Sequence, residues 1–276
     1  MPSPFDDEKF FLTLLSKAVA GKASDVHIKV GQPPGARIRG EIIYFRTDKL
    51  TPADGEAVAR IVITNEAVRS KLHELKEYDT SYSAPGIGRF RVNVYRQRGS
   101  LAVVMRFIPS DIPAMESLGL PTPVTRELSE RPNGMVLVVG AAGNGKSTSI
   151  ASMVGHLNAT QALHIVTVED PIEFLHRDVM SSISQREVGF DTASFAAALR
   201  AALRQDPDVI FVGEIRDEET MDIALKAAET GHLVMATLHT SDAVRTVNRM
   251  LALMPGDVAE NRVRIASCMQ GIIAQR

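Results

Sequence analysis

The segment from Gly140 to Ser147 reads G-A-A-G-N-G-K-S and fits the pattern G-x-x-x-x-G-K-[ST]. Glycines allow such a loop to curl so that its backbone N–H groups face phosphate oxygens, and the helix that follows adds a favourable dipole. Lys146 is expected to reach the β and γ phosphates, and the Ser147 hydroxyl to bind Mg²⁺. An apolar run at 135–139 precedes the loop, and a helical stretch follows it. The segment therefore predicts binding of ATP with Mg²⁺.

A second apolar run, at 209–212, ends in Gly213 and Glu214. Such a run followed by a carboxylate is typical of the segment that holds magnesium or orients water in nucleotide-hydrolysing enzymes. The usual aspartate directly after the strand is replaced by Gly213, and the acid comes one residue later. Glu214 is the candidate for polarising an attacking water or for holding Mg²⁺ through water. The alternative is a strand-end glutamate that faces solvent.

Three carboxylates, Glu169, Asp170 and Glu173, lie within five residues after the apolar run 164–168. Like charges this close repel one another unless a cation offsets them. The carboxyl ends of parallel strands lie on the same edge of a sheet as a phosphate-binding loop. A magnesium ion held directly or through water would explain the cluster and would supply the acid that is missing at Gly213. A solvated acidic loop is the alternative.

Two groups of cationic or titratable side chains extend the predicted site. His239 follows the apolar run 233–238 and is expected near the γ phosphate as a donor or sensor, although a lone histidine is often structural. Five arginines fall between Arg89 and Arg106. They favour three interpretations: a solvated basic strand face, an arginine finger that contacts phosphate across a domain or subunit junction, or a nucleic-acid strip.

The elements that position these residues differ between the two halves of the chain. In the second half the apolar runs alternate with helical stretches near 146–157, 193–205 and 217–230, with 242–252 and 257–273 after the last run. This alternation predicts a parallel sheet covered on both faces. The first 108 residues show α+β patterning. Residues 109–133 hold five of the chain's 14 prolines, which predicts a linker or domain boundary.

Composition excludes several classes of protein. The chain has 276 residues, of which 45% are hydrophobic and 23% charged, as in an ordinary globular protein. Its net charge of −2 gives no global basic field for nucleic acid. Cys268 is the single cysteine, so neither an intrachain disulfide nor a cysteine zinc cluster is expected. No apolar stretch approaches the ~18 residues needed to span a bilayer, so a membrane role is expected to go through a partner.

Taken together, the motifs resemble those of the type II/IV secretion ATPase superfamily, and most closely its PilT-like branch of type IV pilus retraction ATPases. The segments that carry the resemblance are GAAGNGKST, VEDPIEF, QREVGFDT, LRQDPDVIFVGEIRD and AAETGHLVMATLHTSDA, with SDVHIKVGQPP and GRFRVNVYRQRG in the N-terminal half. They stand in the family's order and cover essentially the whole chain.

The resemblance implies a fold and a domain organisation. The expected fold is α/β, with an N-terminal α+β PAS-like domain over 1–108, a Pro-rich linker over 109–133, and a RecA-like P-loop ATPase core with a mostly parallel sheet over 134–276. The family's C-terminal helical region has no counterpart in the sequence, so a truncated chain is expected. Family members form hexameric rings that hydrolyse ATP between subunits.

The resemblance also assigns roles to individual residues. Lys146, Glu214, Glu173 and His239 are the catalytic candidates, and Gly213 is normal for the family. The metal candidates are Ser147 and, directly or through water, Glu169, Asp170, Glu173 or Glu214. The nucleotide-binding positions are Gly140, Ala141, Ala142, Gly143, Asn144, Gly145, Lys146, Ser147 and Thr148, with Arg91, Arg98 and Arg106 of the N-terminal domain. The loop departs from the family at Ala141, Ala142 and Asn144, whose side chains the backbone cradle does not require.

The implied function is an ATP-hydrolysing ring motor that powers type IV pilus retraction and twitching motility. Its expected location is cytoplasmic, peripheral at the inner membrane through a pilus platform protein, with paralogous pilus ATPases as further partners and no direct contact with nucleic acid. The alternatives are a PilU-like accessory retraction ATPase and a pilus extension or type II secretion ATPase. More remote are a RecA-like nucleic-acid translocase and an assembly subunit that does not hydrolyse ATP.

Overall fold

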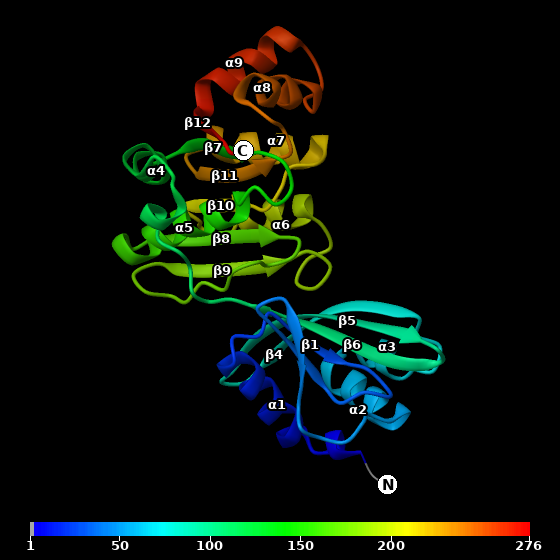
Figure 1. The fold of residues 1–276 in the computed structure, drawn as a ribbon. Helices are drawn as coiled ribbons and strands as arrows, with labels where there is room; N and C mark the ends of the chain where they lie inside the picture. Colours follow the sequence, from blue (N-terminus) through cyan, green and yellow to red (C-terminus); the bar gives the residue numbers. More distant parts are fainter. Residues whose placement is uncertain (1–2) are drawn as a thin grey trace. The chain divides into compact units, whose positions relative to one another are not determined.

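Two six-stranded sheets organise the chain in a computed structural model that describes residues 3–276 (Figure 1). The residues form two units that divide between Pro109 and Ser110. Every neighbouring pair of strands is antiparallel in the first sheet and parallel in the second. This arrangement confirms the predicted α/β class.

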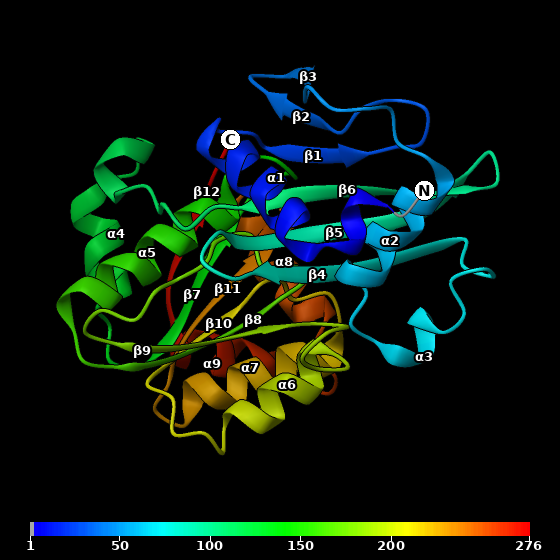
Figure 2. The ribbon, with the colours of Figure 1, turned by 90° about the horizontal axis from the view of Figure 1, so that it is seen from below.

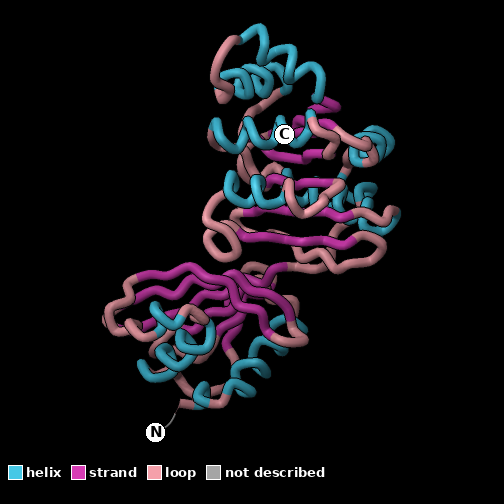
Figure 3. The backbone as a smooth tube through the Cα atoms, turned by 180° about the vertical axis from the view of Figure 1, so that it is seen from behind, coloured by secondary structure: helices cyan, strands magenta, loops and turns pink. Residues whose placement is uncertain are grey.

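The first unit has the strand order β3-β2-β1-β6-β5-β4. Residues alternate between the two faces of this sheet, so that Phe90 and Val92 of β5 pack in one core with Phe11 and Leu15 of α1 and Val58 of α2. Both helices therefore lie on one face (Figure 3). The elements are η1 (Pro4–Asp6), α1 (Glu8–Ala20), β1 (Asp25–Ile28), β2 (Gly35–Ile38), β3 (Glu41–Tyr44), α2 (Pro52–Val62), α3 (Glu66–Arg69), β4 (Glu77–Ala84), β5 (Gly88–Gln97) and β6 (Ser100–Ile108).

The second unit has the strand order β12-β7-β11-β10-β8-β9. Strands that are distant in sequence are thus neighbours in this sheet. The elements are η2 (Met115–Leu118), α4 (Thr122–Ser129), β7 (Gly134–Val139), α5 (Lys146–Thr160), β8 (His164–Glu169), β9 (Ser182–Glu187), α6 (Phe195–Ala202), β10 (Val209–Val212), α7 (Glu218–Glu229), β11 (Leu233–Leu238), α8 (Ala243–Ala252), α9 (Val258–Cys268) and β12 (Met269–Ala274).

Helices cover both faces of the parallel sheet, and strand β7 shows how the sequence arranges this. All six of its residues are buried. Val136 and Val138 point into a core shared with α4 and α5, whereas Leu137 and Val139 point into the core shared with α6 and α7. The two helix layers lie on opposite sides of the sheet in Figure 2. A strand buried on both faces reads as a continuous apolar run, which is why the sequence predicts it clearly.

The helix predicted over 257–273 is wrong over its last five residues, 269–273. Helix α9 ends at Cys268, and the chain continues as strand β12, which pairs with the outer edge of β7. The β-branched Ile272 and Ile273 favour a strand. Gly271 also lets Leu128 of α4 approach, because a Cβ there would lie 2.8 Å from the leucine methyl carbons. The tertiary partner decides the structure of this segment.

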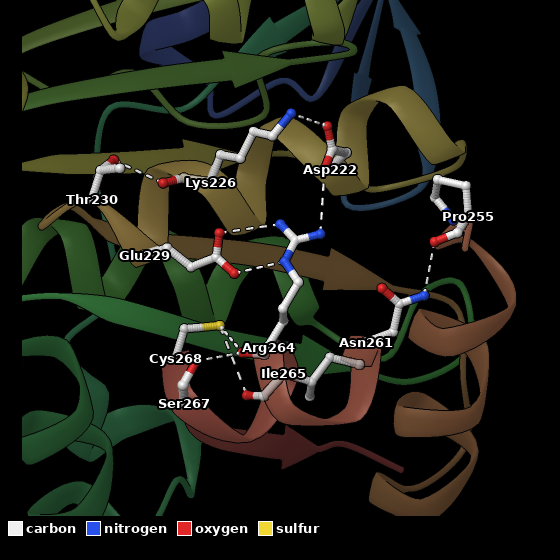
Figure 4. A network of polar contacts seen from close by, with 10 residues as sticks. All are labelled: Asp222, Lys226, Glu229, Thr230, Pro255, Asn261, Arg264, Ile265, Ser267 and Cys268. Atoms are coloured by element: carbon white, nitrogen blue, oxygen red, sulfur yellow. Dashed lines mark hydrogen bonds and ion pairs between the residues drawn. The ribbon is translucent and has the colours of Figure 1, made fainter. Parts of the chain in front are cut away.

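One polar network joins α7 to α9 (Figure 4). The guanidinium of Arg264 donates from Nε to Glu229 Oε1 at 2.8 Å and from a terminal nitrogen to Oε2 at 3.1 Å. Its other terminal nitrogen lies 3.5 Å from Asp222, which also pairs with Lys226 at 2.7 Å. The Arg264 side chain is only 26% exposed. A two-pronged contact in such a setting is stronger than an exposed ion pair.

We therefore expect Arg264→Ala to lower the free energy of unfolding of the second unit by about 1–2 kcal/mol, because Glu229 loses a charge-assisted partner. Chemical denaturation followed by circular dichroism measures the change. Arg262→Ala is the matched control, since Arg262 is exposed on the same helix, and a change within about 0.5 kcal/mol is expected there. Equal effects of the two substitutions would contradict the role given to the network.

Candidate nucleotide site

A pocket of about 320 Å³ opens where β7, β8, β10 and β11 end. It lies at the carboxyl edge of the parallel sheet, the edge at which open α/β sheets bind ligands. The residues that line it are Ala142, Gly143, Gly145, Lys146, Ser147, Thr148, Glu169, Asp170, Pro171, Glu173, Phe211, Gly213, Glu214, Thr237 and His239. The structure thus brings together all four catalytic candidates and all the acidic metal candidates. Gly140, Ala141 and Asn144 are not part of the lining.

The loop between β7 and α5 has the conformation that its glycines permit. Gly143 and Gly145 have φ of 81° and 80°, in the left-handed region that side chains disfavour. Gly145 caps α5 without a side-chain bond, so the first turn of the helix leaves N–H groups free to face the pocket. An anion at this position would meet these donors and the positive end of the helix dipole.

Lys146 is the first residue of α5 and is buried. Its ammonium donates to the carbonyl oxygens of Gly140 at 3.0 Å and Ala141 at 2.9 Å, and lies 3.5 Å from Nδ1 of His239. Burial lowers the pKa of Lys146, while the charge of Glu214 acts in the opposite direction. The cation is therefore held at the base of the loop, where phosphate oxygens would stabilise its charged form.

Glu214 follows β10 by two residues, and its side chain is only 12% exposed. One carboxylate oxygen pairs with the guanidinium of Arg216, and the other lies 3.3 Å from Nε2 of His239. His239 therefore lies between the ammonium of Lys146 and the carboxylate of Glu214. The two contacts fit the neutral tautomer that carries its proton on Nε2, which donates to Glu214 while Nδ1 accepts from Lys146.

The absence of a side chain at Gly213 has a packing explanation. A Cβ at this position would lie 3.2 Å from Cα of Glu169 and 3.2 Å from the carbonyl oxygen of Val168, closer than ordinary contact. The Gly213 amide donates to that same Val168 carbonyl at 2.7 Å, and its own carbonyl accepts from the Thr237 hydroxyl at 2.5 Å. A side chain here would require the backbone of β8 to shift by a few tenths of an ångström, and the acid of this segment stands at the next residue.

The three carboxylates of the acidic cluster occupy different environments. Glu169 ends β8 and is buried, and one oxygen accepts from the Thr167 hydroxyl at 2.6 Å and from the Gln185 amide at 3.1 Å. Burial raises its pKa to about 7. Asp170 is more exposed and lies 3.7 Å from Arg216. Glu169 is thus anchored to the protein, whereas Asp170 and Glu173 are the carboxylates of this cluster that are freer to face a ligand.

The environment of Glu169 predicts a pH-dependent stability. Its pKa is about 7 in the folded chain, against 4.5 for an ordinary glutamate. A raised folded-state pKa contributes stability below the unfolded pKa, and that contribution is lost as pH rises through the folded one. We therefore expect the wild type to lose free energy of unfolding relative to Glu169→Gln as the pH rises. The difference between the two proteins should change by about 3 kcal/mol from pH 5 to pH 8. Denaturant unfolding in EDTA at several pH values measures it, and a difference that does not change with pH would contradict the prediction.

The three arginine candidates belong to the first unit, on or beside the sheet face opposite its helices. Arg91 of β5 stands directly opposite Arg106 of β6. Arg106 donates from Nε to the buried carboxylate of Asp25 at 2.9 Å. Arg91 is exposed, and the described residues give it no ion pair. Arg98 lies in the turn between the two strands with φ of 49°. Of the three arginines, Arg106 is the one that forms an ion pair with a carboxylate of its own unit.

Sequence reasoning missed several residues that shape the pocket. Arg216 contacts both Glu214 and Asp170, and Gln185 fixes Glu169. Arg216 stands two residues after Glu214. A cation this close in sequence to a predicted catalytic acid could have indicated an ion pair between them. Gln185 lies on β9, a polar strand that the hydrophobic pattern does not predict.

Among residues 3–276, no group of three or more histidine, cysteine, aspartate or glutamate side chains is arranged to bind a metal ion alone. In the same part of the chain, no helix combines the length and apolar character needed to cross a bilayer.

Comparisons with known proteins show which family the chain resembles. A family model described as type II/IV secretion system protein matches residues 7–276. The chain is 43% identical over 265 residues to the type IV pilus retraction ATPase PilT of Pseudomonas aeruginosa, covering 95% of this chain and 76% of that protein. It is 43% identical over 245 residues to a twitching motility protein of Neisseria gonorrhoeae, covering 88% of this chain and 64% of that relative, less than two thirds of its length. A crystal structure of the pilus retraction motor PilT with bound ADP matches with a TM-score of 0.87 and 48% identity, over 96% of this chain and 77% of that one.

Proposed function

This chain belongs to the type II/IV secretion system protein family, and from that premise we propose that it is an ATPase motor that retracts type IV pili. The observation that carries the proposal is the pocket in which the glycine-rich loop, Lys146, Glu214 and His239 meet at the edge of a parallel sheet. The similarity to proteins named for pilus retraction and twitching motility supports the choice of this motor over others.

The triphosphate of ATP would lie along the loop. The N–H groups of Gly143 and Gly145 and the first turn of α5 bind its phosphate oxygens, and Lys146 moves from loop carbonyls to the β and γ phosphates. The donor set also fits Mg²⁺, because the Ser147 hydroxyl and nearby carboxylates are hard oxygen ligands that leave further positions to phosphate and water. The ion would neutralise the charge that develops on the phosphates.

Hydrolysis requires a water in line with the γ phosphate. Glu214 is the group that orients this water, assisted by Glu173, which lines the same pocket. Both oxygens of Glu214 are engaged in the structure, by Arg216 and by His239. Each oxygen can accept a second hydrogen bond, so the water can bind to Glu214 while both contacts persist. His239 contacts both Lys146 and Glu214, so it is placed to register the loss of the γ phosphate.

A further positive charge would come from a neighbouring subunit. Arg91 suits this role better than Arg106, since Arg106 is already paired with Asp25. A guanidinium supplied in trans stabilises the transferred phosphoryl group and makes turnover depend on assembly. The proposal thus includes a homo-hexameric ring that acts at the inner membrane through a pilus platform protein, together with paralogous pilus ATPases.

The test is the ATPase rate per chain as a function of protein concentration, with light scattering on the same samples. We expect the rate to rise as a hexamer-sized species appears, and to fall strongly in Arg91→Ala but less in Arg106→Ala at equal assembly. Mixing Arg91→Ala with Lys146→Ala should restore part of the activity, because each variant supplies what the other lacks. Full activity from a monomer would overturn the shared-site motor.

A further inference from the structure

Gln275 lies beside the nucleotide-binding loop without lining the pocket. Strand β12 pairs with β7 in parallel, with Ala274 opposite Val139. The pairing continues for one residue, since the Gln275 amide donates to the Val139 carbonyl at 2.8 Å. Gln275 is therefore fixed where β7 becomes the loop.

The backbone carbonyl of Gln275 is held by the loop itself. It accepts a hydrogen bond from Nδ2 of Asn144 at 3.0 Å. The same oxygen would lie 2.6 Å from a Cβ at position 140, so the loop can pass this close only because residue 140 is a glycine. Asn144 is one of the positions at which this loop departs from the family pattern. Its side chain, which the phosphate cradle does not need, has a partner outside the pocket.

The side chain of Gln275 reaches the other end of the loop. Its Nε2 donates at 2.8 Å to the hydroxyl of Ser149, a buried residue in the first turn of α5. Its Oε1 is buried, and no hydrogen-bond donor for it exists among residues 3–276. A buried acceptor without a donor destabilises a fold. The Gln275 amide therefore lowers stability through its Oε1 while its Nε2 holds Ser149.

We propose that Gln275 is a positioning residue that, together with Asn144, holds the nucleotide-binding loop in its phosphate-binding conformation. This inference rests on the proposed function of the pocket. The residue contacts the chain before the loop at Val139, within it at Asn144 and after it at Ser149. Loss of these contacts would therefore loosen the loop and lower the affinity of the site for nucleotide, whereas looser packing elsewhere in β12 would not.

The experiment compares four proteins: the wild type, Gln275→Met, Asn144→Ala and Ile273→Ala. Gln275→Met keeps the length of the side chain but removes the amide, including the unpaired acceptor. Ile273→Ala is the matched control, because it loosens β12 one pair before Val139 without contacting the loop. The readouts are the Kd for a fluorescent ADP derivative with Mg²⁺, KM and kcat for ATP, the Tm of the ADP-free protein, and hydrogen exchange of the loop amides.

We expect Gln275→Met and Asn144→Ala to raise both Kd and KM about 5- to 10-fold, the effect of losing one hydrogen bond. The kcat should change less than about twofold, because the lost contact acts on bound ground and transition states alike. Loop amides should exchange faster in both variants without ADP, while Tm hardly changes in Gln275→Met. Ile273→Ala should lower Tm and leave Kd unchanged.

Two outcomes would overturn the inference. One is an unchanged Kd and unchanged loop exchange in both Gln275→Met and Asn144→Ala. The other is a Kd that follows Tm in all variants, Ile273→Ala included, since that would reflect general destabilisation. A wild type that does not bind the ADP derivative would contradict the proposed function instead, and the exchange of the loop amides still decides whether Gln275 fixes the loop.

Discussion

Lys146→Ala is expected to reduce ATP turnover by at least about 100-fold, because it removes the buried ammonium that we propose binds the phosphates. In the folded chain this ammonium bonds two loop carbonyls, and burial lowers its pKa. Since burial of a charge is unfavourable, its loss should leave Tm unchanged or slightly raised. A coupled phosphate-release assay, with thermal unfolding in parallel, measures both quantities.

The control for this prediction is Lys226→Ala, which removes a lysine from an exposed ion pair on α7. It should leave turnover within about twofold of the wild type, since surface ion pairs contribute little. Turnover retained in Lys146→Ala would contradict the assignment of the loop as the phosphate site. A fall in turnover that accompanies a large loss of Tm would point to unfolding rather than to lost chemistry.

Glu214→Gln should separate binding from hydrolysis. We expect turnover to fall about 100-fold to 1,000-fold, the range for loss of a positioned general base or water-orienting group. Nucleotide affinity should stay within about threefold, because the Gln side chain keeps the volume of the carboxylate and the loop is untouched. The Gln amide still accepts from Arg216 or His239 through its carbonyl oxygen, so the pocket should keep its shape.

Single-turnover kinetics with ATP and equilibrium binding of ADP check the two halves of this prediction. Glu218→Gln is the matched control, since Glu218 is exposed in the first turn of α7. It should behave as the wild type in both assays. If Glu214→Gln lost affinity and turnover in equal measure, Glu214 would act in binding nucleotide, and the water-orienting role would be wrong.

The parts of the fold that the sequence predicts are those with a strong local pattern. Strand β7 is apolar throughout because both faces are buried, and the loop after it needs glycines at positive φ. Each of these features depends on residues that are consecutive in the sequence, so it can be recognised without knowing the fold. The same holds for β10 and Glu214, where an apolar strand ends in a single acid.

Features that depend on distant partners were not predictable in this way. Strand β9 is polar and partly exposed, so no apolar period marks it, and its place is set by pairing with β8. Strand β12 follows a helix with no Gly or Pro between the two elements, and pairing with the edge of β7 decides its conformation. The contact of Arg216 with Asp170 and the contacts of Gln275 likewise arise from tertiary neighbours. The sequence shows which polar side chains the chain carries, and the order of strands in the sheet decides which of them come into contact.

The order of strands also has a consequence for how the protein is made. Strand β7 ends at Val139, but its two partners in the sheet are β11, which begins at Leu233, and β12, which begins at Met269. During synthesis, the loop that follows β7 therefore leaves the ribosome long before either neighbouring strand exists. Non-local pairings of this kind form late. The nucleotide pocket should be among the last parts of the nascent chain to form, so ATP cannot stabilise early folding steps.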